Sequence, residues 1–147
     1  MSAQELAIEL ASSSINPHLL VSPHGYGELN GAGQNREQPF QIKVHPQVGM
    51  ISDVHSHLCD AEVIGLLAGK YDVKKKILYI QFPFPCVSTV RSEDDGSTDV
   101  ELDPVAEIAV RETIEKMGLQ VVGWYHSHPK FRPDPSVIDI HNHWDGS

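Results

Sequence analysis

Two short apolar runs constrain the fold of this chain most strongly. The first extends from Glu62 to Gly69, and the second extends from Val121 to Tyr125. Uninterrupted apolar runs of this length are typical of buried strands, and they are far too short for a membrane span. We therefore expect both segments to be strands of a sheet, the first of them buried.

A third strand and a helix are expected before the first apolar run. Phe40, Ile42 and Val44 alternate with polar residues, a pattern typical of a half-buried strand. Pro46 suits the first turn of a following helix, where its missing N–H has no cost. The apolar face expected for that helix is formed by Ile51, Val54 and Leu58.

The middle of the chain predicts a further strand. The basic turn Lys74–Lys76 leads into an expected strand from Ile77 to Phe82, which Pro83 and Pro85 should end because proline cannot donate a ladder hydrogen bond.

The strongest helix signals surround residues 103–118. Asp103 is a good N-cap, Pro104 fits the first helical position, and Gly118 suits the C-terminal cap. The predicted order is strand, helix, strand, strand, helix, strand and then a Pro-rich loop. This order predicts an α/β fold in which helices pack against a sheet.

Length and pattern indicate one domain with flanking segments. The 147 residues suffice for a single core, and residues 39–140 should hold it. Residues 1–38 are expected to be a flexible segment with one short helix, whose apolar positions are Ala3, Leu6, Ala7 and Leu10. Residues 141–147 read as a polar tail without regular structure.

Charge and cysteine content exclude several classes of function. The net charge of −9 favours neither a broad nucleic-acid surface nor attraction to an anionic membrane. Six of the twenty acidic residues lie between Glu93 and Asp103, which indicates a solvated loop or a place where a basic partner binds. Two widely spaced cysteines, with no secretory signal and no long apolar run, favour an intracellular, reducing compartment.

Three His-x-His pairs occur, and their sequence context separates them. His126 and His128 follow the predicted strand, where residues i and i+2 point to one face and can share a metal ion. His55 and His57 lie in a predicted helix, where the same spacing separates side chains by roughly 200°. His141 and His143 lie in the terminal tail, where no scaffold is expected to hold them.

A catalytic zinc usually has three protein ligands and one open position, so a third ligand is needed. Asp139 is the natural candidate, because the turn-forming segment 131–135 can fold it back toward the strand end. Ser136 and Asp139 also fit a capping box at a helix start, a common motif. The two roles are compatible.

These residues together resemble the JAMM motif of the MPN-domain zinc metalloproteases. The motif's parts are Glu62 at the start of its apolar run, His126-Ser127-His128-Pro129, and then Ser136 and Asp139. The similarity covers about residues 38–140, and the segments around Gln38 and Trp124 are most similar to histone-directed deubiquitinases of this family. It implies the MPN fold, a cytidine-deaminase-like mixed sheet flanked by helices, incomplete at its C-terminus.

The resemblance also implies a reaction. His126, His128 and Asp139 would bind one Zn²⁺, Glu62 would be the general base that acts on a zinc-activated water, and Ser136 would orient that water or stabilise the oxyanion. The substrate would be the isopeptide bond between ubiquitin and a lysine of a protein such as a histone. The expected location is the nucleus, with no membrane or direct nucleic-acid partner.

Two other functions stay open at this point. The chain could be a non-catalytic MPN interaction module, or an inactive truncated fragment, that binds ubiquitin or a scaffold protein without turnover. It could also be a zinc hydrolase that uses the same scaffold to act on a small molecule or a sulfur carrier.

Overall fold

The computed structural model describes residues 20, 38–92, 98–130 and 132–145. The chain divides into two compact units, one formed by Gln38–Phe131 and the other by the remaining residues, and each is described by itself. The short helix expected near the N-terminus and the linker that follows it lie outside the described residues, apart from Leu20. Among the helices described, none has the length and apolar character needed to cross a membrane.

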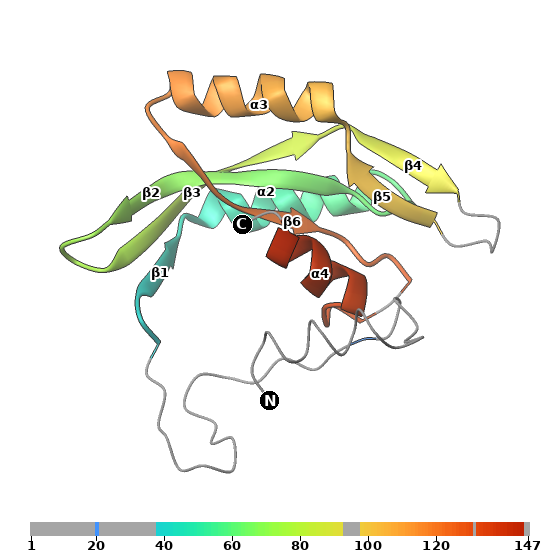
Figure 1. Ribbon diagram of the computed structural model, residues 1–147, viewed down its shortest axis with the longest axis horizontal. Coiled ribbons are helices and arrows are strands. Elements are labelled where there is room, and N and C mark those ends of the chain that lie inside the picture. The colour runs from blue at the N-terminus through green and yellow to red at the C-terminus, as the bar shows by residue number, and fades with distance from the viewer. Residues whose placement is uncertain (1–19, 21–37, 93–97, 131, 146–147) are drawn as a thin grey trace, which may run out of the picture. The chain divides into compact units, whose positions relative to one another are not determined.

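A four-stranded mixed sheet is the centre of the larger unit (Figure 1). Its strands lie in the order β1 (Gln41–Val44), β3 (Ile77–Cys86), β2 (Ile64–Asp72) and β6 (Gln120–His126). β1 pairs with β3 in parallel, whereas β2 pairs with both β3 and β6 in antiparallel orientation. The two apolar runs of the sequence therefore form neighbouring strands, of which β2 is internal and β6 is terminal, and the expected α/β fold is confirmed.

Helices α2 (Pro46–His57) and α3 (Pro104–Lys116) cover opposite faces of the sheet (Figure 1). Trp124 of β6 packs into the core beneath α3, whereas its neighbour Tyr125 contacts α2. Adjacent strand residues point to opposite faces, so the two helices must lie on different sides. The buried cluster on the α3 side consists of Leu66, Ala68, Cys86, Ile114 and Leu119.

The capping signals around α3 are confirmed. The Asp103 carboxylate accepts hydrogen bonds from the backbone N–H groups of Val105 and Ala106 at 2.9 and 2.8 Å. Pro104 takes the first helical position, and Gly118 follows the helix with a φ of 72°, a conformation that suits glycine. Ile114, the one described side chain that is both large and fully buried, anchors the helix to the sheet.

The expected apolar face of α2 is wrong. Ile51, Val54 and Leu58 are 37%, 55% and 77% exposed. Val48 is instead the buried residue of α2, and His55, seven residues further along the helix, contacts Tyr125 of the sheet. These positions lie two turns apart on one side of the helix, so the apolar residues fall on a neighbouring side.

β1 is also more exposed than its alternating pattern predicts. All four of its residues are exposed, because β1 is the outermost strand of the described sheet and no helix among the described residues packs on it as α3 packs on the centre of the sheet. The apolar residues Ile42 and Val44 therefore appear on the surface, and the half-buried strand predicted here is corrected to an exposed edge strand.

The predicted end of β3 at Pro83 is wrong as well, because the strand continues through both prolines to Cys86. β1 covers β3 only from Ile77 to Ile80, so the later part of β3 has an open edge. Pro83 and Pro85 are two residues apart and turn their nitrogen atoms to the same side. That side is the open one, where a missing N–H breaks no ladder bond.

The acidic segment contains a strand rather than only a loop. β4 (Ser88–Ser92) and β5 (Thr98–Leu102) form a separate antiparallel hairpin. Thr98, Val100 and Leu102 alternate with acidic residues, and this period of two is the strand signal that the high charge concealed.

The expected tail is likewise helical. In the smaller unit, α4 (Val137–Asp145) includes most of residues 141–147, because the capping box described below starts a helix that propagates through them.

Two strand glycines offer a matched test of the sheet. A Cβ at Gly69, which lies at a β-bulge, would collide with the carbonyl oxygen of Tyr79, whereas a Cβ at Gly123 would meet Leu67 Cδ1 at 3.5 Å. Gly69→Ala should therefore lower the free energy of unfolding by about 1–3 kcal/mol or more. Gly123→Ala should be neutral or raise it by about 0.5–1 kcal/mol. Urea denaturation measures both, and equal effects would contradict this account of the bulge.

Candidate metal centre

The antiparallel pairing of β2 with β6 builds the candidate site. Ile64, the first residue of β2, lies opposite His126, the last residue of β6. Glu62 precedes this point by two residues and His128 follows it by two, so both emerge at the same end of the sheet. Residues 64 places apart in the sequence therefore meet because the two buried strands run in opposite directions.

Ser127 fastens the two strand ends together. Its backbone N–H donates to the carbonyl oxygen of Val63 at 3.0 Å, and its Oγ accepts a hydrogen bond from the Val63 N–H, also at 3.0 Å. These reciprocal bonds fix the backbone between the two histidines against the residue that follows Glu62. The spacing of the chemically active side chains is thus set by backbone geometry.

The side chains of Glu62, His126 and His128 converge. The Nε2 atoms of the two imidazoles lie 2.8 Å apart, and Glu62 Oε1 lies 3.8 Å from His126 Nε2. One ligand atom from each of the three lies within 4.8 Å of the others. Two imidazole nitrogens and a carboxylate are donors that zinc prefers in proteins, so the chemistry of these residues fits a zinc ion.

Trp124 supports the first histidine. Its ring stacks on the His126 imidazole with centroids 4.9 Å apart and an interplanar angle of 19°. Trp124 is itself packed against the buried cluster beneath α3. The core therefore restricts the orientation of the His126 ring, as a preorganised metal ligand requires.

Tyr125 secures the other face of the same strand end. Its hydroxyl lies 2.9 Å from His55 Nδ1, and its ring covers Gly65, where any Cβ would collide with it. Burial raises the pKa of Tyr125 to about 12, with a smaller contribution from Cys86, and burial lowers the pKa of His55. The phenol is therefore protonated at neutral pH, and its hydrogen bond with His55 ties α2 to the strand.

Ser136 and Asp139 belong to the smaller unit, where they form the expected capping box at the start of α4. The Ser136 N–H donates to Asp139 Oδ2 at 2.7 Å, and the Asp139 N–H donates to Ser136 Oγ at 3.2 Å. Leu20 forms an isolated antiparallel bridge with Ser136. The capping role is thus observed, and a metal-binding role for Asp139 stays a prediction.

The other His-x-His pairs differ from this arrangement. His55 and His57 lie on α2 as predicted, where His55 contacts Tyr125 and the exposed His57 contacts Asp53. His141 and His143 lie on α4, where a separation of two residues points them in very different directions. Of the three pairs, only His126 and His128 are described with their ring nitrogens converging.

Two contributors to the site were not assigned from sequence. Ser127 stood inside the motif without a role, and its bonds to Val63 depend on a pairing that only the fold reveals. Gly65 gave a weak signal as a glycine inside a buried strand, which indicates a close approach by another group. The group that approaches it, Tyr125, is 60 residues away in sequence.

Comparison with known proteins agrees with this geometry. Residues 37–145 match the family described as JAB1/Mov34/MPN/PAD-1 ubiquitin protease. The chain therefore belongs to this MPN-domain family, and the resemblance noted in the sequence is confirmed.

Among its relatives, the deubiquitinase MYSM1 of Mus musculus is 37% identical over 134 residues, which are 91% of this chain and 15% of that protein. The histone deubiquitinase MYSM1 of Xenopus laevis is 36% identical over 128 residues, or 87% of this chain and 14% of that protein. An MPN domain-containing protein of Homo sapiens is 36% identical over 125 residues, or 85% of this chain and 24% of its own length. The chain thus spans only a small part of these relatives.

Ser127→Ala tests whether the paired strand ends depend on the serine hydroxyl. The change leaves the partly buried Val63 N–H without its acceptor and should lower the free energy of unfolding by about 1 kcal/mol. Ser127→Thr keeps a hydroxyl at the same position and should retain most of this stability. Denaturant unfolding compares the three proteins, and equal stability of the alanine variant would exclude a structural role for this bond.

Proposed function

We propose that this chain is a zinc-dependent isopeptidase domain that removes ubiquitin from lysine side chains. The observation that carries the proposal is the convergence of His126 Nε2, His128 Nε2 and the Glu62 carboxylate at the end of β2 and β6. Membership of a ubiquitin protease family supports the reaction class.

His126, His128 and Asp139 are proposed as the three zinc ligands. The histidines approach one another from one strand end, and the capping box holds the Asp139 carboxylate through Oδ2. A carboxylate has a second oxygen, which the proposal assigns to the ion. Capping and coordination are then two functions of one side chain.

Glu62 is proposed as the general base. A bound zinc would lower the pKa of a water molecule toward ~7 and thereby supply a nucleophile at neutral pH. The Glu62 carboxylate, which lies 3.8 Å from His126 Nε2, would accept the proton of that water and return it to the leaving lysine amine. The Ser136 hydroxyl would donate a hydrogen bond where negative charge develops on the scissile carbonyl oxygen.

The proposed substrate is a ubiquitinated protein, and a histone is the proposed target. The support is the name of the Xenopus laevis relative, a histone deubiquitinase. The nucleus is accordingly the proposed location. The chain spans 14–15% of the length of the two MYSM1 relatives.

Glu62→Gln tests the proposed base. The change preserves shape but removes the proton acceptor, so zinc should still bind with one ion per chain while cleavage of ubiquitin conjugates falls by about 10²–10⁴-fold. Metal analysis and a di-ubiquitin cleavage assay, with and without chelator, provide the readouts. His57→Ala, which replaces an exposed histidine of α2, is the matched control. It should change neither zinc binding nor the rate of cleavage. Full activity in Glu62→Gln would refute the mechanism.

Asp139→Asn separates coordination from capping. The amide oxygen of Asn can still accept the Ser136 N–H, so α4 should keep its start, while the anionic ligand is lost. We expect zinc affinity to fall by at least about tenfold, because carboxylate ligands bind zinc as anions. A zinc titration with a fluorescent chelator measures this change. An unaltered zinc affinity would show that Asp139 caps α4 but does not bind zinc.

The same assays decide between the catalytic function and the alternatives. Zinc binding with retained ubiquitin binding but no turnover would select the non-catalytic interaction module. Cleavage of a small-molecule or sulfur-carrier substrate, with ubiquitin conjugates left intact, would select a different zinc hydrolase.

A further inference from the structure

Within the described part of the chain, the outer edge of β1 is open. In the sheet order β1-β3-β2-β6, β1 is terminal, and no strand among the described residues pairs with its other side. The N–H groups of Gln41 and His45 bond to β3, each at 2.9 Å. Because residues of a parallel strand alternate between neighbours, Ile42 and Val44 turn their backbone N–H and C=O groups away from β3.

The side chains of β1 give this edge two different faces. Ile42 and Val44 share one face and are 48% and 53% exposed. Lys43 lies on the opposite face, because successive strand residues alternate. A strand added along β1 would therefore meet apolar side chains on one face and a lysine on the other.

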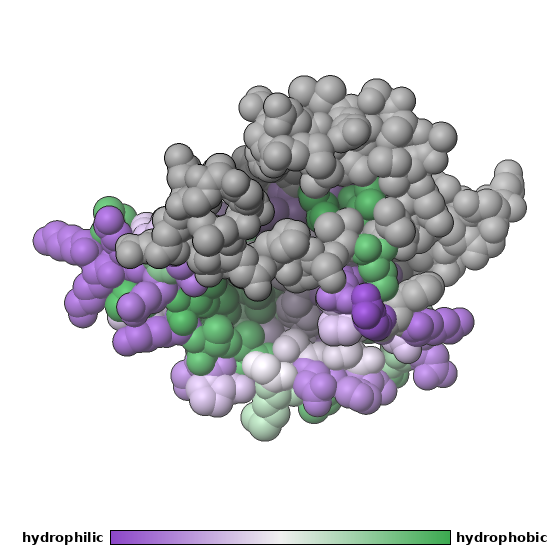
Figure 2. Space-filling view, turned by 90° about the horizontal axis from the view of Figure 1, so that it is seen from below, coloured by the Kyte–Doolittle hydropathy of each residue, from purple (hydrophilic) through white to green (hydrophobic). Residues whose placement is uncertain are grey.

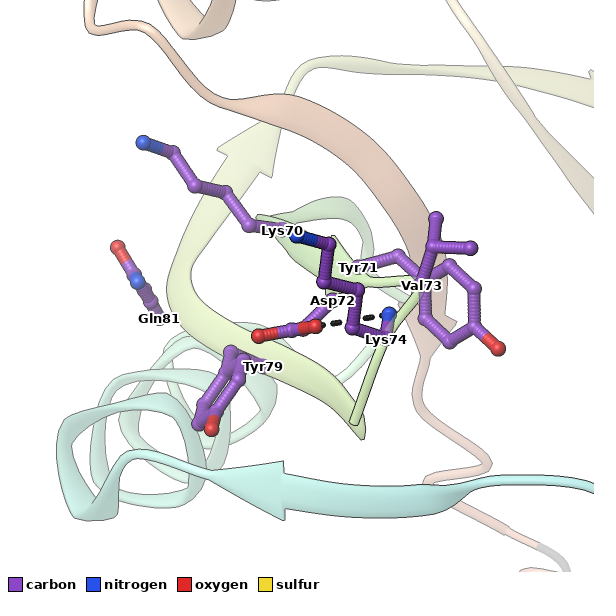
Figure 3. A pocket seen from close by; sticks show the side chains of 7 residues that line it. All are labelled: Lys70, Tyr71, Asp72, Val73, Lys74, Tyr79 and Gln81. Atoms are coloured by element: carbon purple, nitrogen blue, oxygen red, sulfur yellow. Dashed lines mark hydrogen bonds between the residues drawn. The ribbon is translucent and has the colours of Figure 1, made fainter. Parts of the chain in front are cut away.

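The face that carries Lys43 continues as a basic, aromatic row across the sheet. The strand register places Lys43 opposite Tyr79 and Tyr79 opposite Lys70. Lys43 Nζ lies 6.0 Å from the centre of the Tyr79 ring. An open hollow of about 560 Å³ lies at the β2–β3 hairpin, and Figure 3 shows Lys70, Tyr79 and Gln81 on the same side of it.

A second hollow, of about 440 Å³, joins this row to β1. Its lining includes Lys43 and Val44 of β1 and Gln47 at the start of α2, and it shares Tyr79 and Gln81 with the first hollow. The two hollows therefore extend from the hairpin to the open edge.

Positive charge gathers at this end of the sheet. Five of the eleven basic residues of a chain with net charge −9 lie here: Lys43, Lys70, Lys74, Lys75 and Lys76. The nearby Asp72 carboxylate accepts the backbone N–H groups of Lys74 and Lys75 at 3.0 and 2.9 Å, which makes it a turn cap. Figure 2 shows hydrophilic side chains crowded at the left end, where the β2–β3 hairpin lies.

We propose that the open edge of β1 binds an extended acidic peptide segment as an added strand. Its backbone would pair with Ile42 and Val44, its acidic side chains would lie beside Lys43 on the neighbouring strand, and its apolar side chains would cover Ile42 and Val44. Lys70 is six residues along β2 from Ile64, or about 20 Å from the candidate metal centre. The surface is thus a docking site separate from the proposed catalysis.

The observations favour a peptide over a nucleic acid. Binding to a phosphate backbone depends on neutralising many phosphates with lysine and arginine, and the remainder of this chain of net charge −9 would repel a long polyanion. The exposed side chains of Ile42 and Val44 have neither a charge nor a hydrogen-bonding group for a nucleic acid. They can pack against the alternate side chains of an added strand.

The test uses a fluorescent seven-residue peptide that alternates Asp with Val, and the complete chain. Fluorescence anisotropy should show saturable binding. Lys43→Glu should weaken binding by about fivefold or more, since it replaces an attraction between neighbouring strands with a repulsion, whereas Lys70→Glu, about three strand spacings or ~14 Å from the added strand, should weaken it less. Lys116→Glu, the same charge change on the exposed end of α3, should leave binding unchanged.

Two further probes test the strand geometry itself. The same peptide N-methylated at every second residue should not bind, because it cannot complete the ladder. Ile42→Pro should also abolish binding while keeping the fold by circular dichroism, since it removes an outward N–H and no bond to β3. Equal binding by the N-methylated peptide, no binding by any peptide, or preference for a single-stranded oligonucleotide would each overturn the proposal. Absence of peptide binding would mean that Lys43 merely protects an edge strand from aggregation.

Discussion

The antiparallel pairing of β2 with β6 is the interaction on which the candidate site depends. It places Ile64 opposite His126, and the reciprocal bonds between Val63 and Ser127 then lock the two strand ends. β2 lies inside the sheet and is largely buried, whereas β6 is the terminal strand and is held by its pairing with β2 and by the packing of Trp124 and Tyr125, which makes this strand end rigid. Backbone hydrogen bonds in a covered sheet open only at substantial free-energy cost, and this rigidity suits a centre that must hold its ligands in place.

The two faces of that strand end are supported differently. On one face, Trp124 connects the His126 ring to the core beneath α3, so packing controls the ring orientation. On the other, Tyr125 crosses Gly65 to reach His55 on α2. The proton stays on the phenol because burial raises its pKa, so this link persists at neutral pH. Both helices thereby stabilise the ends of the strands that carry the chemistry.

Sequence reasoning succeeded where the signal was local. The cap at Asp103, the strands built from the apolar runs and the capping box at Ser136 each depend on a few neighbouring residues and were found where expected. It failed where long-range contacts decide the extent of a strand or the exposure of a side chain. Pro83 sits inside a strand because β1 has already ended, and Val54 is exposed because α2 rotates His55 toward the sheet. Neither fact can be seen in the local pattern.

The sequence by itself determined the chemistry available to this protein: two histidines at strand spacing, a glutamate at the start of an apolar run, and a capped aspartate. These follow from residue identity and short-range periodicity. Only the tertiary structure decided that Glu62 and His126 face one another at 3.8 Å and that Ser127 holds them there. It also decided that β1 presents an open edge beside a row of lysines. The reason is that register and strand order are set by long-range pairing, which no local segment specifies.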